Sequence, residues 1–271
     1  RKPMPTLMTR ALAQLALILE EVGLFARTTV DVVLWSVRPP YRGWLLVQQM
    51  ETIGVKSLFV VTLTSAFTGL VMVLQSTSLL AKFQAEGLVG SSVALAVTRE
   101  LGPVFTGLMV TGRAGSAMAT ELGTMRVTEQ IDAMATMAVN PVQYLIVPRV
   151  LASILMLPVL AAIFDMVSFF GSYVMGVLML GIDQGVFVER TRHFLDPIDI
   201  SSGLYKAAVF GAIIALISCH KGLLAEGGAK GVGEATTKAV VASSVAILVS
   251  DYFLNVLMTN YLPGYVLGGP R

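Results

Sequence analysis

Long apolar stretches separated by short polar segments dominate this chain. A helix needs about 20 apolar residues to cross the roughly 30 Å hydrocarbon core of a bilayer. Stretches near or above that length, together with one shorter one, occur at residues 57–80, 88–118, 150–180, 204–218 and 240–262. The first holds no charged residue, and each of the others holds at least one. The pattern predicts an all-α integral membrane protein that crosses the bilayer five times.

Residues 10–37, ahead of the first span, predict an amphipathic helix that lies in the membrane interface. Their apolar residues recur at steps of three and four, with Glu20 and Glu21 off that stripe. Trp35 and Trp44, like Tyr41, suit the headgroup level, and Pro39-Pro40 breaks the helix. A sixth span is the alternative, but two central acids would each cost about 2.5–3.5 kcal/mol on insertion scales.

The pattern of residues 123–140, between the second and third spans, predicts a short amphipathic helix. This helix is expected to end at Asn140-Pro141. Its apolar face is formed by Val127, Ile131, Met134 and Ala138, and Arg126, Glu129, Gln130 and Asp132 lie largely off it.

The segment 222–238 holds five glycines. It predicts a tight turn, and the alternative is an anion-binding loop. The segment lacks the Gly-Lys-Ser/Thr ending of a nucleotide-binding loop. The charged segment 181–202 predicts a small exposed helix or a partner contact.

Composition agrees with a membrane protein. Hydrophobic residues make up 55% of the 271 residues and charged residues 13%, against roughly 25% charged in soluble domains. A net charge of +2 gives no basic surface for nucleic acid. The single cysteine, Cys219, excludes an internal disulfide, and two histidines are too few for a His-rich metal site.

The distribution of Lys and Arg predicts the orientation. With a cytoplasmic N-terminus, 13 basic residues lie on the cytoplasmic side and four on the other. Basic loops are retained in the cytoplasm, so this bias favours a cytoplasmic N-terminus and, with five spans, a C-terminus on the outer side of the membrane.

Ionisable residues inside the spans are the candidate functional residues, because such positions are costly and usually face a bundle interior. We expect Glu100, Lys206 and Asp251, with the adjacent Arg99, to line a cavity for the polar head of an amphiphile. The alternative is that they form salt bridges that only fix helix packing. Pro103 is expected to free a backbone carbonyl in the same helix. Asp165 has no evident partner, and both interior hydrogen bonding and a functional role stay open.

Other motifs give weaker signals. The small residues between Gly107 and Thr120 predict close helix packing or, alternatively, a homodimer interface. The sequence contains no Walker motif, no His-Glu-x-x-His and no Gly-x-Ser-x-Gly, so we expect no catalysis and no bound cofactor in this chain.

Two blocks resemble the MlaE/YrbE permease family of MCE-associated ABC lipid transporters. The first comprises Arg99-Glu-Leu-Gly-Pro103 and residues 112–134, and the second comprises residues 227–241 followed by Asp251-Tyr-Phe-Leu. The resemblance implies a homodimeric permease of the bacterial inner membrane. It further implies a phospholipid cargo, with a role in outer-membrane lipid asymmetry, and a separate cytoplasmic ATPase that uses ATP and Mg²⁺. A periplasmic MCE-domain protein and in some systems a STAS-domain subunit are the other implied partners.

By the same resemblance, the 123–140 helix is the coupling helix, and Arg126, Glu129 and Asp132 are its expected contacts to the ATPase. Two other classes of function stay open. One is an ion-coupled secondary transporter with Glu100, Asp165 and Asp251 as a proton relay, although five spans divide poorly into repeats. The other is a structural scaffold of a membrane complex.

Overall fold

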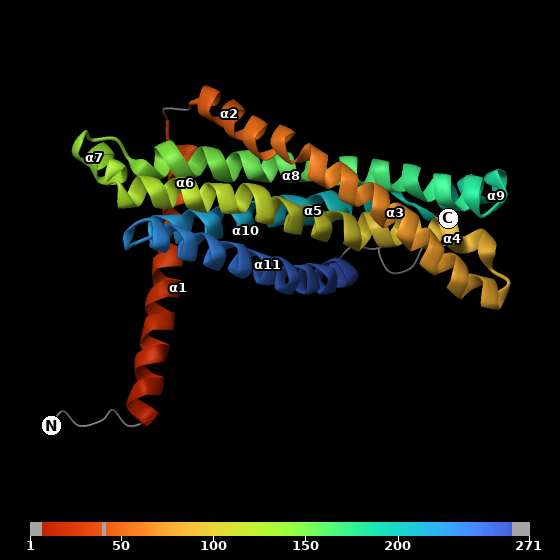
Figure 1. Cartoon of the computed structure of the whole chain (residues 1–271), viewed down its shortest axis with the longest axis horizontal. Helices are drawn as coiled ribbons and strands as arrows, with labels where there is room; N and C mark the ends of the chain where they lie inside the picture. The colour runs from red at the N-terminus through yellow and green to blue at the C-terminus, as the bar shows by residue number, and fades with distance from the viewer. Residues whose placement is uncertain (1–6, 40–41, 262–271) are drawn as a thin grey trace.

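The protein is a bundle of long, nearly parallel helices with one helix set across its end (Figure 1). The computed structural model describes the backbone of residues 7–39 and 42–261, and side chains from 19–39 and 42–260. Within these ranges every regular element is helical, which confirms the all-α prediction. The α-helices are α1 (Leu7–Val37), α2 (Gly43–Ile53), α3 (Leu58–Leu80), α4 (Val89–Ala96), α5 (Gly102–Val110), α6 (Ser116–Val127), α7 (Gln130–Thr136), α8 (Val147–Tyr173), α9 (Gln184–Phe194), α10 (Pro197–Leu223) and α11 (Gly228–Tyr261).

Shorter helical turns join several of these helices without interrupting their course. The 3₁₀ turns are η1 (Val55–Ser57), η2 (Ala81–Phe83) and η3 (Glu86–Leu88), and the π-helical turns are η4 (Val97–Leu101), η5 (Thr111–Gly115), η6 (Val142–Ile146) and η7 (Val174–Met179). Five continuous helices are long and apolar enough to cross a membrane: Gly43–Phe83, Glu86–Val127, Val142–Met179, Pro197–Leu223 and Gly228–Asn260. The predicted number of five spans is confirmed.

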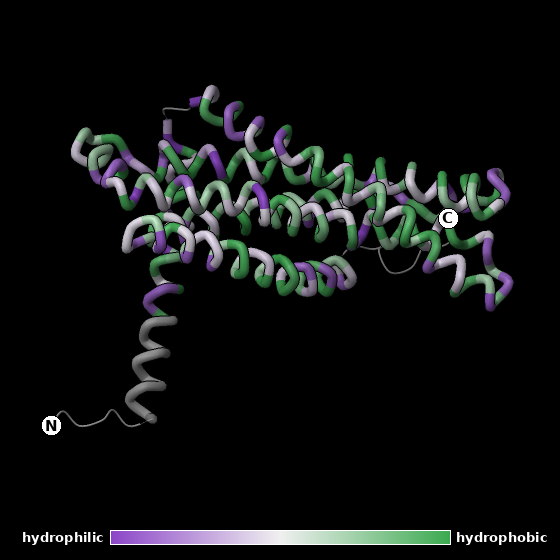
Figure 2. Tube along the Cα trace, viewed as in Figure 1, coloured by the Kyte–Doolittle hydropathy of each residue, from purple (hydrophilic) through white to green (hydrophobic). Residues whose placement is uncertain are grey.

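Polar residues gather at the two ends of the bundle and apolar residues fill its length (Figure 2). The coupling segment around α7, the start of α2 and the turn between α10 and α11 lie at one end. The opposite end carries α9 and the turn between α3 and α4 (Figure 1). The helix α9 agrees with the small helix expected within 181–202.

The centre of the bundle is α8, which packs between α3 and α10. Close backbone contact is possible there because glycines face it on both sides. A Cβ on Gly69 of α3 would lie 2.1 Å from the Ser168 carbonyl oxygen, and one on Gly211 of α10 would lie 2.5 Å from that of Ser153. Close packing of small residues, rather than hydrophobic burial, drives helix association in lipid.

The helix α1 crosses the end of the bundle at a steep angle (Figure 1). Val32 is buried and Trp35 packs against the core, whereas Leu19, Val22, Val30 and Val33 of the apolar stripe are exposed. This orientation suits a helix that lies along a membrane surface, and its place in the interface stays a prediction. Tyr41 and the side chain of Arg10 lie outside the described residues, as do Arg1, Lys2 and Arg271, which were counted for orientation.

Several predicted boundaries differ from the structure. The fourth span, α10, is longer than 204–218 because Asp199 and Lys221 lie near its ends and do not stop it. The fifth begins at Gly228 rather than 240, and residue 262 lies outside the described part. Glycine weakens a helix by about 1 kcal/mol, but Val232 and Ala235 of this segment are buried in a small cluster. The packing of this segment against α6 therefore outweighs the low helix propensity of its glycines.

The predicted single helix over 123–140 is wrong as a continuous element. Residues up to Val127 extend α6, and the chain turns at Glu129, whose φ of 58° is left-handed. A separate helix, α7, follows and ends before Ala138, which also has a positive φ. No glycine or proline marks the Glu129 turn in the sequence, so the pattern gave no sign of it.

Candidate functional site

A cluster of charged side chains lies inside the bundle where η4, α10 and α11 meet. The structure brings together Glu100 from η4, Lys206 from α10 and Asp251 from α11, three residues that are far apart in the sequence. Arg99, the fourth predicted residue, lies beside them on η4. Three of the four predicted side chains therefore form one group, and Arg99 meets it through its main-chain oxygen.

The Lys206 ammonium is the centre of this group, and its residue is completely buried. Its Nζ donates hydrogen bonds to the Asn255 Oδ1 at 2.6 Å, the Arg99 carbonyl oxygen at 2.9 Å and the Glu100 Oε1 at 3.0 Å. An ammonium has three N–H donors, so these acceptors use all of them. The Asp251 Oδ1 lies 3.3 Å away as an ion-pair partner.

Asn255 completes the cluster, and the sequence analysis missed it. Its Nδ2 donates to the Glu100 Oε2 at 2.7 Å and lies 3.4 Å from the Asp251 Oδ2. The residue is one helical turn after Asp251, so it shares that residue's face of α11. This spacing was the available signal, but a neutral amide does not stand out in a search for charges.

Pro103 explains why a main-chain oxygen belongs to the cluster. Proline has no N–H, so it cannot donate to the carbonyl four residues earlier, which is that of Arg99. The π-helical turn η4 includes Arg99 and Glu100, and such turns are frequent at functional sites. The freed carbonyl oxygen accepts the hydrogen bond from Lys206, as a proline at this position predicts.

Arg99 points to a second carboxylate instead of the Lys206 group. Its Nε and Nη2 lie 2.7 and 2.6 Å from the Asp199 Oδ1. Asp199 is buried, and its other oxygen accepts from the Asp196 backbone N–H at the start of α10. Asp199 belongs to the charged segment 181–202, for which a small exposed helix or a partner contact was predicted, and its distance from Arg99 in the chain hid the pairing.

Asp165 lies in α8 and, among the described residues, is not one of the partners of Lys206. It is buried, its Oδ1 lies against the backbone of Gly102, and that oxygen has no hydrogen-bond partner among the described residues. Among the described residues, no hydrogen bond or ion pair joins it to Glu100 or Asp251, with which it was combined in the proton-relay hypothesis.

Burial sets the electrostatics of the cluster. Lys206 is inaccessible, whereas 39% of the Glu100 side chain and 17% of the Asp251 side chain stay exposed. A buried charge is tolerated when opposite charges and hydrogen bonds replace its water. Lys206 thus holds two carboxylates in place, and Glu100 and Arg99 are the members that a bound molecule can reach.

The three predicted coupling residues lie together at one end of the bundle. The Arg126 Nη1 is 2.6 Å from the Asp132 Oδ1, and this pair links the end of α6 to α7. Both side chains are exposed, and Glu129 occupies the turn between them. The arrangement forms a polar, solvent-facing surface that a soluble partner can contact.

Comparison with known proteins identifies the chain's relatives. The family model described as Permease MlaE matches residues 46–257. The chain belongs to the MlaE permease family. That region includes the whole Lys206 cluster and the predicted coupling segment, and it excludes all of α1.

Similar proteins include a probable ABC transporter permease protein of Rickettsia felis, 46% identical over 88% of this chain and 92% of that protein. The Haemophilus influenzae intermembrane phospholipid transport system permease protein MlaE is 38% identical over 79% of this chain and 82% of its own length. The chloroplastic Arabidopsis thaliana protein TRIGALACTOSYLDIACYLGLYCEROL 1 is 44% identical over 77% of this chain and 59% of its length. The MlaE-family chain is accordingly a multi-pass ABC transporter permease, the membrane subunit of such a transporter.

Proposed function

We propose that this permease moves phospholipid between the bacterial inner membrane and a periplasmic MCE-domain partner, in support of outer-membrane lipid asymmetry. A cytoplasmic ATPase supplies the energy from ATP and Mg²⁺, and a STAS-domain subunit belongs to the assembly where one is present. The N-terminus is cytoplasmic and the C-terminus periplasmic. The name of the Haemophilus relative supports the cargo class, and the Lys206 cluster is the observation that carries the proposal.

The cluster offers the chemistry that a phospholipid headgroup needs. Arg99 presents a guanidinium for a phosphate, and Glu100 presents a partly exposed carboxylate for an amine or hydroxyl. Lys206 and Asp251 hold Glu100 in place, so they act as positioning residues in this conformation. Nearby apolar side chains, including Leu101 and Phe105, suit acyl chains.

A homodimer gives the site a closed boundary. The apolar window of α11 is the least buried of the five, 11% against 28–50% in the others. Its exposed residues Val241, Val245, Leu248 and Tyr252 recur at steps of three and four on one face. We assign this face to the dimer contact. Of the small-residue run in the second span, Gly107 and Gly115 instead lie against side chains of the same protomer.

Lipid-stimulated ATP hydrolysis by the reconstituted complex tests the cargo site. Glu100→Gln is expected to lower the lipid-stimulated rate, by about tenfold if one charge-assisted contact is lost, while the lipid-free rate is kept. Glu51→Gln, an exposed carboxylate on α2, is the matched control. An unchanged lipid response in Glu100→Gln contradicts the site. Transport driven by a proton gradient without ATP would instead favour the secondary transporter.

The coupling segment has its own test. Glu129→Ala combined with Asp132→Ala is expected to weaken ATPase binding and to abolish lipid stimulation, because both remove charge from the exposed surface at α7. Glu20→Ala, an exposed carboxylate on α1, is the control. Assembly and transport that both match the wild type would show that α7 is not the coupling helix.

A further inference from the structure

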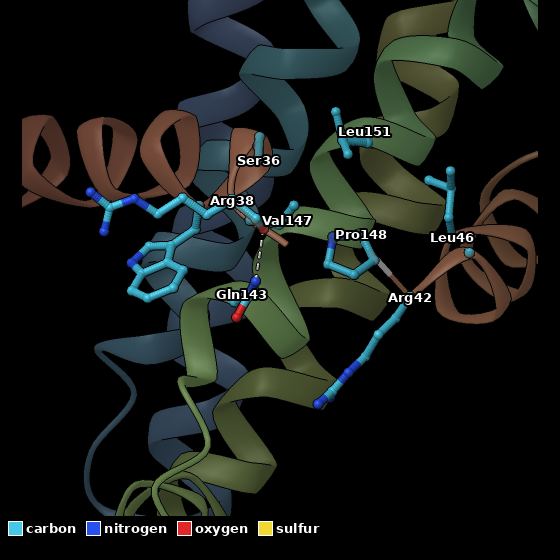
Figure 3. Close-up of a pocket in the computed structure, with 10 residues that line it drawn as sticks. Ser36, Arg38, Arg42, Leu46, Gln143, Val147, Pro148 and Leu151 are labelled. Carbon is cyan, nitrogen blue, oxygen red and sulfur yellow. Dashed lines mark hydrogen bonds between the residues drawn. The ribbon is translucent and has the colours of Figure 1, made fainter. Parts of the chain in front are cut away.

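A second amphiphilic pocket lies at the coupling end of the bundle, away from the Lys206 cluster. It is formed by the end of α1, the start of α2 and the first turns leading into α8 (Figure 3). Trp35 lies in α1 and Arg38 directly follows it, Arg42 directly precedes α2 and Leu46 lies in it, and Gln143 and Leu151 come from η6 and α8. Three separate segments therefore build one hollow.

The rim of the pocket is cationic. The Arg38 guanidinium lies 5.6 Å from the Trp35 ring, and that of Arg42 lies 4.7 Å from the Tyr144 ring. Neither arginine forms an ion pair with a carboxylate of the described residues. Figure 3 shows Gln143 between the two arginines. An anion at this rim would meet positive charge that no carboxylate of residues 19–39 or 42–260 neutralises.

The floor of the pocket is apolar and continues onto the outer surface of the bundle. Leu46, Val147 and Leu151 line it. One turn beyond Leu151, Leu155 is half exposed, and Val47 beside Leu46 is exposed. A hydrocarbon chain can follow this path from the pocket to the lipid-facing side of α2 and α8. A free inorganic anion would leave the path unused.

Hydrogen bonds hold the pocket in shape before any ligand arrives. The Gln143 Nε2 donates to the Arg38 carbonyl oxygen at 3.1 Å, which ties the end of α1 to the chain before α8 (Figure 3). The Asn140 Oδ1 accepts from the Val142 backbone N–H at 2.9 Å and fixes the start of that segment. A preformed site avoids the cost of ordering its parts on binding.

We propose that this pocket binds one anionic phospholipid of the cytoplasmic leaflet, with its phosphate at the Arg38 and Arg42 rim and an acyl chain along the apolar floor. The assignment to that leaflet rests on the proposed function, which places the coupling end in the cytoplasm. Anionic lipids concentrate in that leaflet, and basic residues near it attract them. The resident lipid would fasten α1 to the bundle and occupy a place distinct from the transported one.

Quenching of tryptophan by brominated lipid tests the proposal directly. The chain holds two tryptophans, and Trp44→Phe leaves Trp35, which lines the pocket, as the single reporter. The full chain is reconstituted in phosphatidylcholine vesicles that contain increasing fractions of brominated phosphatidylglycerol or brominated phosphatidylcholine. We expect the anionic lipid to quench Trp35 at a clearly lower mole fraction.

Charge variants identify the residues responsible. Arg38→Gln and Arg42→Gln are each expected to reduce the preference for the anionic lipid about fivefold, because one basic residue near an anionic surface contributes about that factor. Arg42→Lys keeps the charge and most of the preference. Lys82→Gln, an exposed cation at the opposite end, is the control that leaves the preference unchanged.

Three outcomes overturn the proposal: equal quenching by both lipids, a preference that survives both glutamine substitutions, or loss of the preference on adding inorganic phosphate. The last would show an anion site without an acyl component. Unchanged quenching by brominated phosphatidylcholine in the variants shows that they remain folded. Because the measurement needs neither ATP nor transport, its failure is distinguishable from failure of the Glu100 site in the hydrolysis assay.

Discussion

Two ion-paired regions of this permease have similar distances and opposite surroundings. Lys206 and Glu100 lie 3.0 Å apart around a completely buried ammonium, and Arg126 and Asp132 lie 2.6 Å apart with 40% and 61% of their side chains exposed. Solvent weakens the exposed pair, which is worth about 0–1 kcal/mol, whereas breaking a buried pair costs several. The distance between the charged atoms therefore does not show which pair contributes more to stability. Burial therefore distinguishes the two: the Lys206 cluster stabilises the bundle, whereas the exposed Arg126–Asp132 pair is accessible to a partner protein.

The largest effect is expected for Lys206→Met, which leaves Glu100 and Asp251 facing each other without their cation. The cost is about 3–5 kcal/mol, as for one-sided removal of a buried ion pair. Thermal unfolding in detergent measures it. The triple variant Lys206→Met, Glu100→Gln, Asp251→Asn should recover most of the loss. If Lys206→Met alone were as stable as the wild type, the buried ion pairs of Lys206 would not stabilise the fold.

Asn255→Leu should have the next largest effect. It removes an acceptor from Lys206 and a donor from Glu100, and an unsatisfied buried partner costs about 1–3 kcal/mol. The same unfolding measurement applies. Asn255→Asp keeps the acceptor but brings a third carboxylate, so it should also destabilise. Leu254→Met, a neighbouring apolar exchange on α11, should change little.

The Glu21–Lys221 pair joins α1 to α10 at intermediate exposure, and its contribution to stability depends on pH. The hydrogen bond from Lys221 holds the pKa of the Glu21 carboxyl below its ordinary value of 4.5. A lowered folded-state pKa gives stability that is present above pH 4.5 and is lost as the pH falls through the folded value. The protection of α1 amides from hydrogen exchange, taken relative to the intrinsic exchange rate at each pH, should therefore fall on acidification below pH 4.5. Glu21→Gln should remove that dependence; an unaltered profile would exclude the pair as its cause.

Arg126→Ala should have the smallest effect on stability, about 0.2–1 kcal/mol for an exposed pair. Its effect on lipid-stimulated hydrolysis should be large if α7 meets the ATPase. Thermal unfolding and ATP hydrolysis, measured on the same preparation, separate the effect on stability from the effect on activity. A variant that loses stability as Lys206→Met does would show that the exposed pair also holds the fold.

The sequence predicted the five spans because apolar length is a local property. It also grouped Glu100, Lys206 and Asp251, because charges in a membrane need opposite charges and few were available. Asn255 and Asp199 escaped prediction, since one is neutral and the other lies at a helix start far along the chain. The left-handed turn at Glu129 and the helical glycines after Gly228 depend on tertiary packing. No local pattern records that packing.

The glycine contacts on either side of α8 have a mechanical consequence. With the backbone of α8 pressed against Gly69 of α3 and Gly211 of α10, sliding any of these helices would drive carbonyl oxygens into the next Cα. A force applied at one end of these three helices is then transmitted along them as a rigid unit rather than absorbed between them. We expect the motion of a transport cycle to appear at the edge of this unit, where α11 is least enclosed.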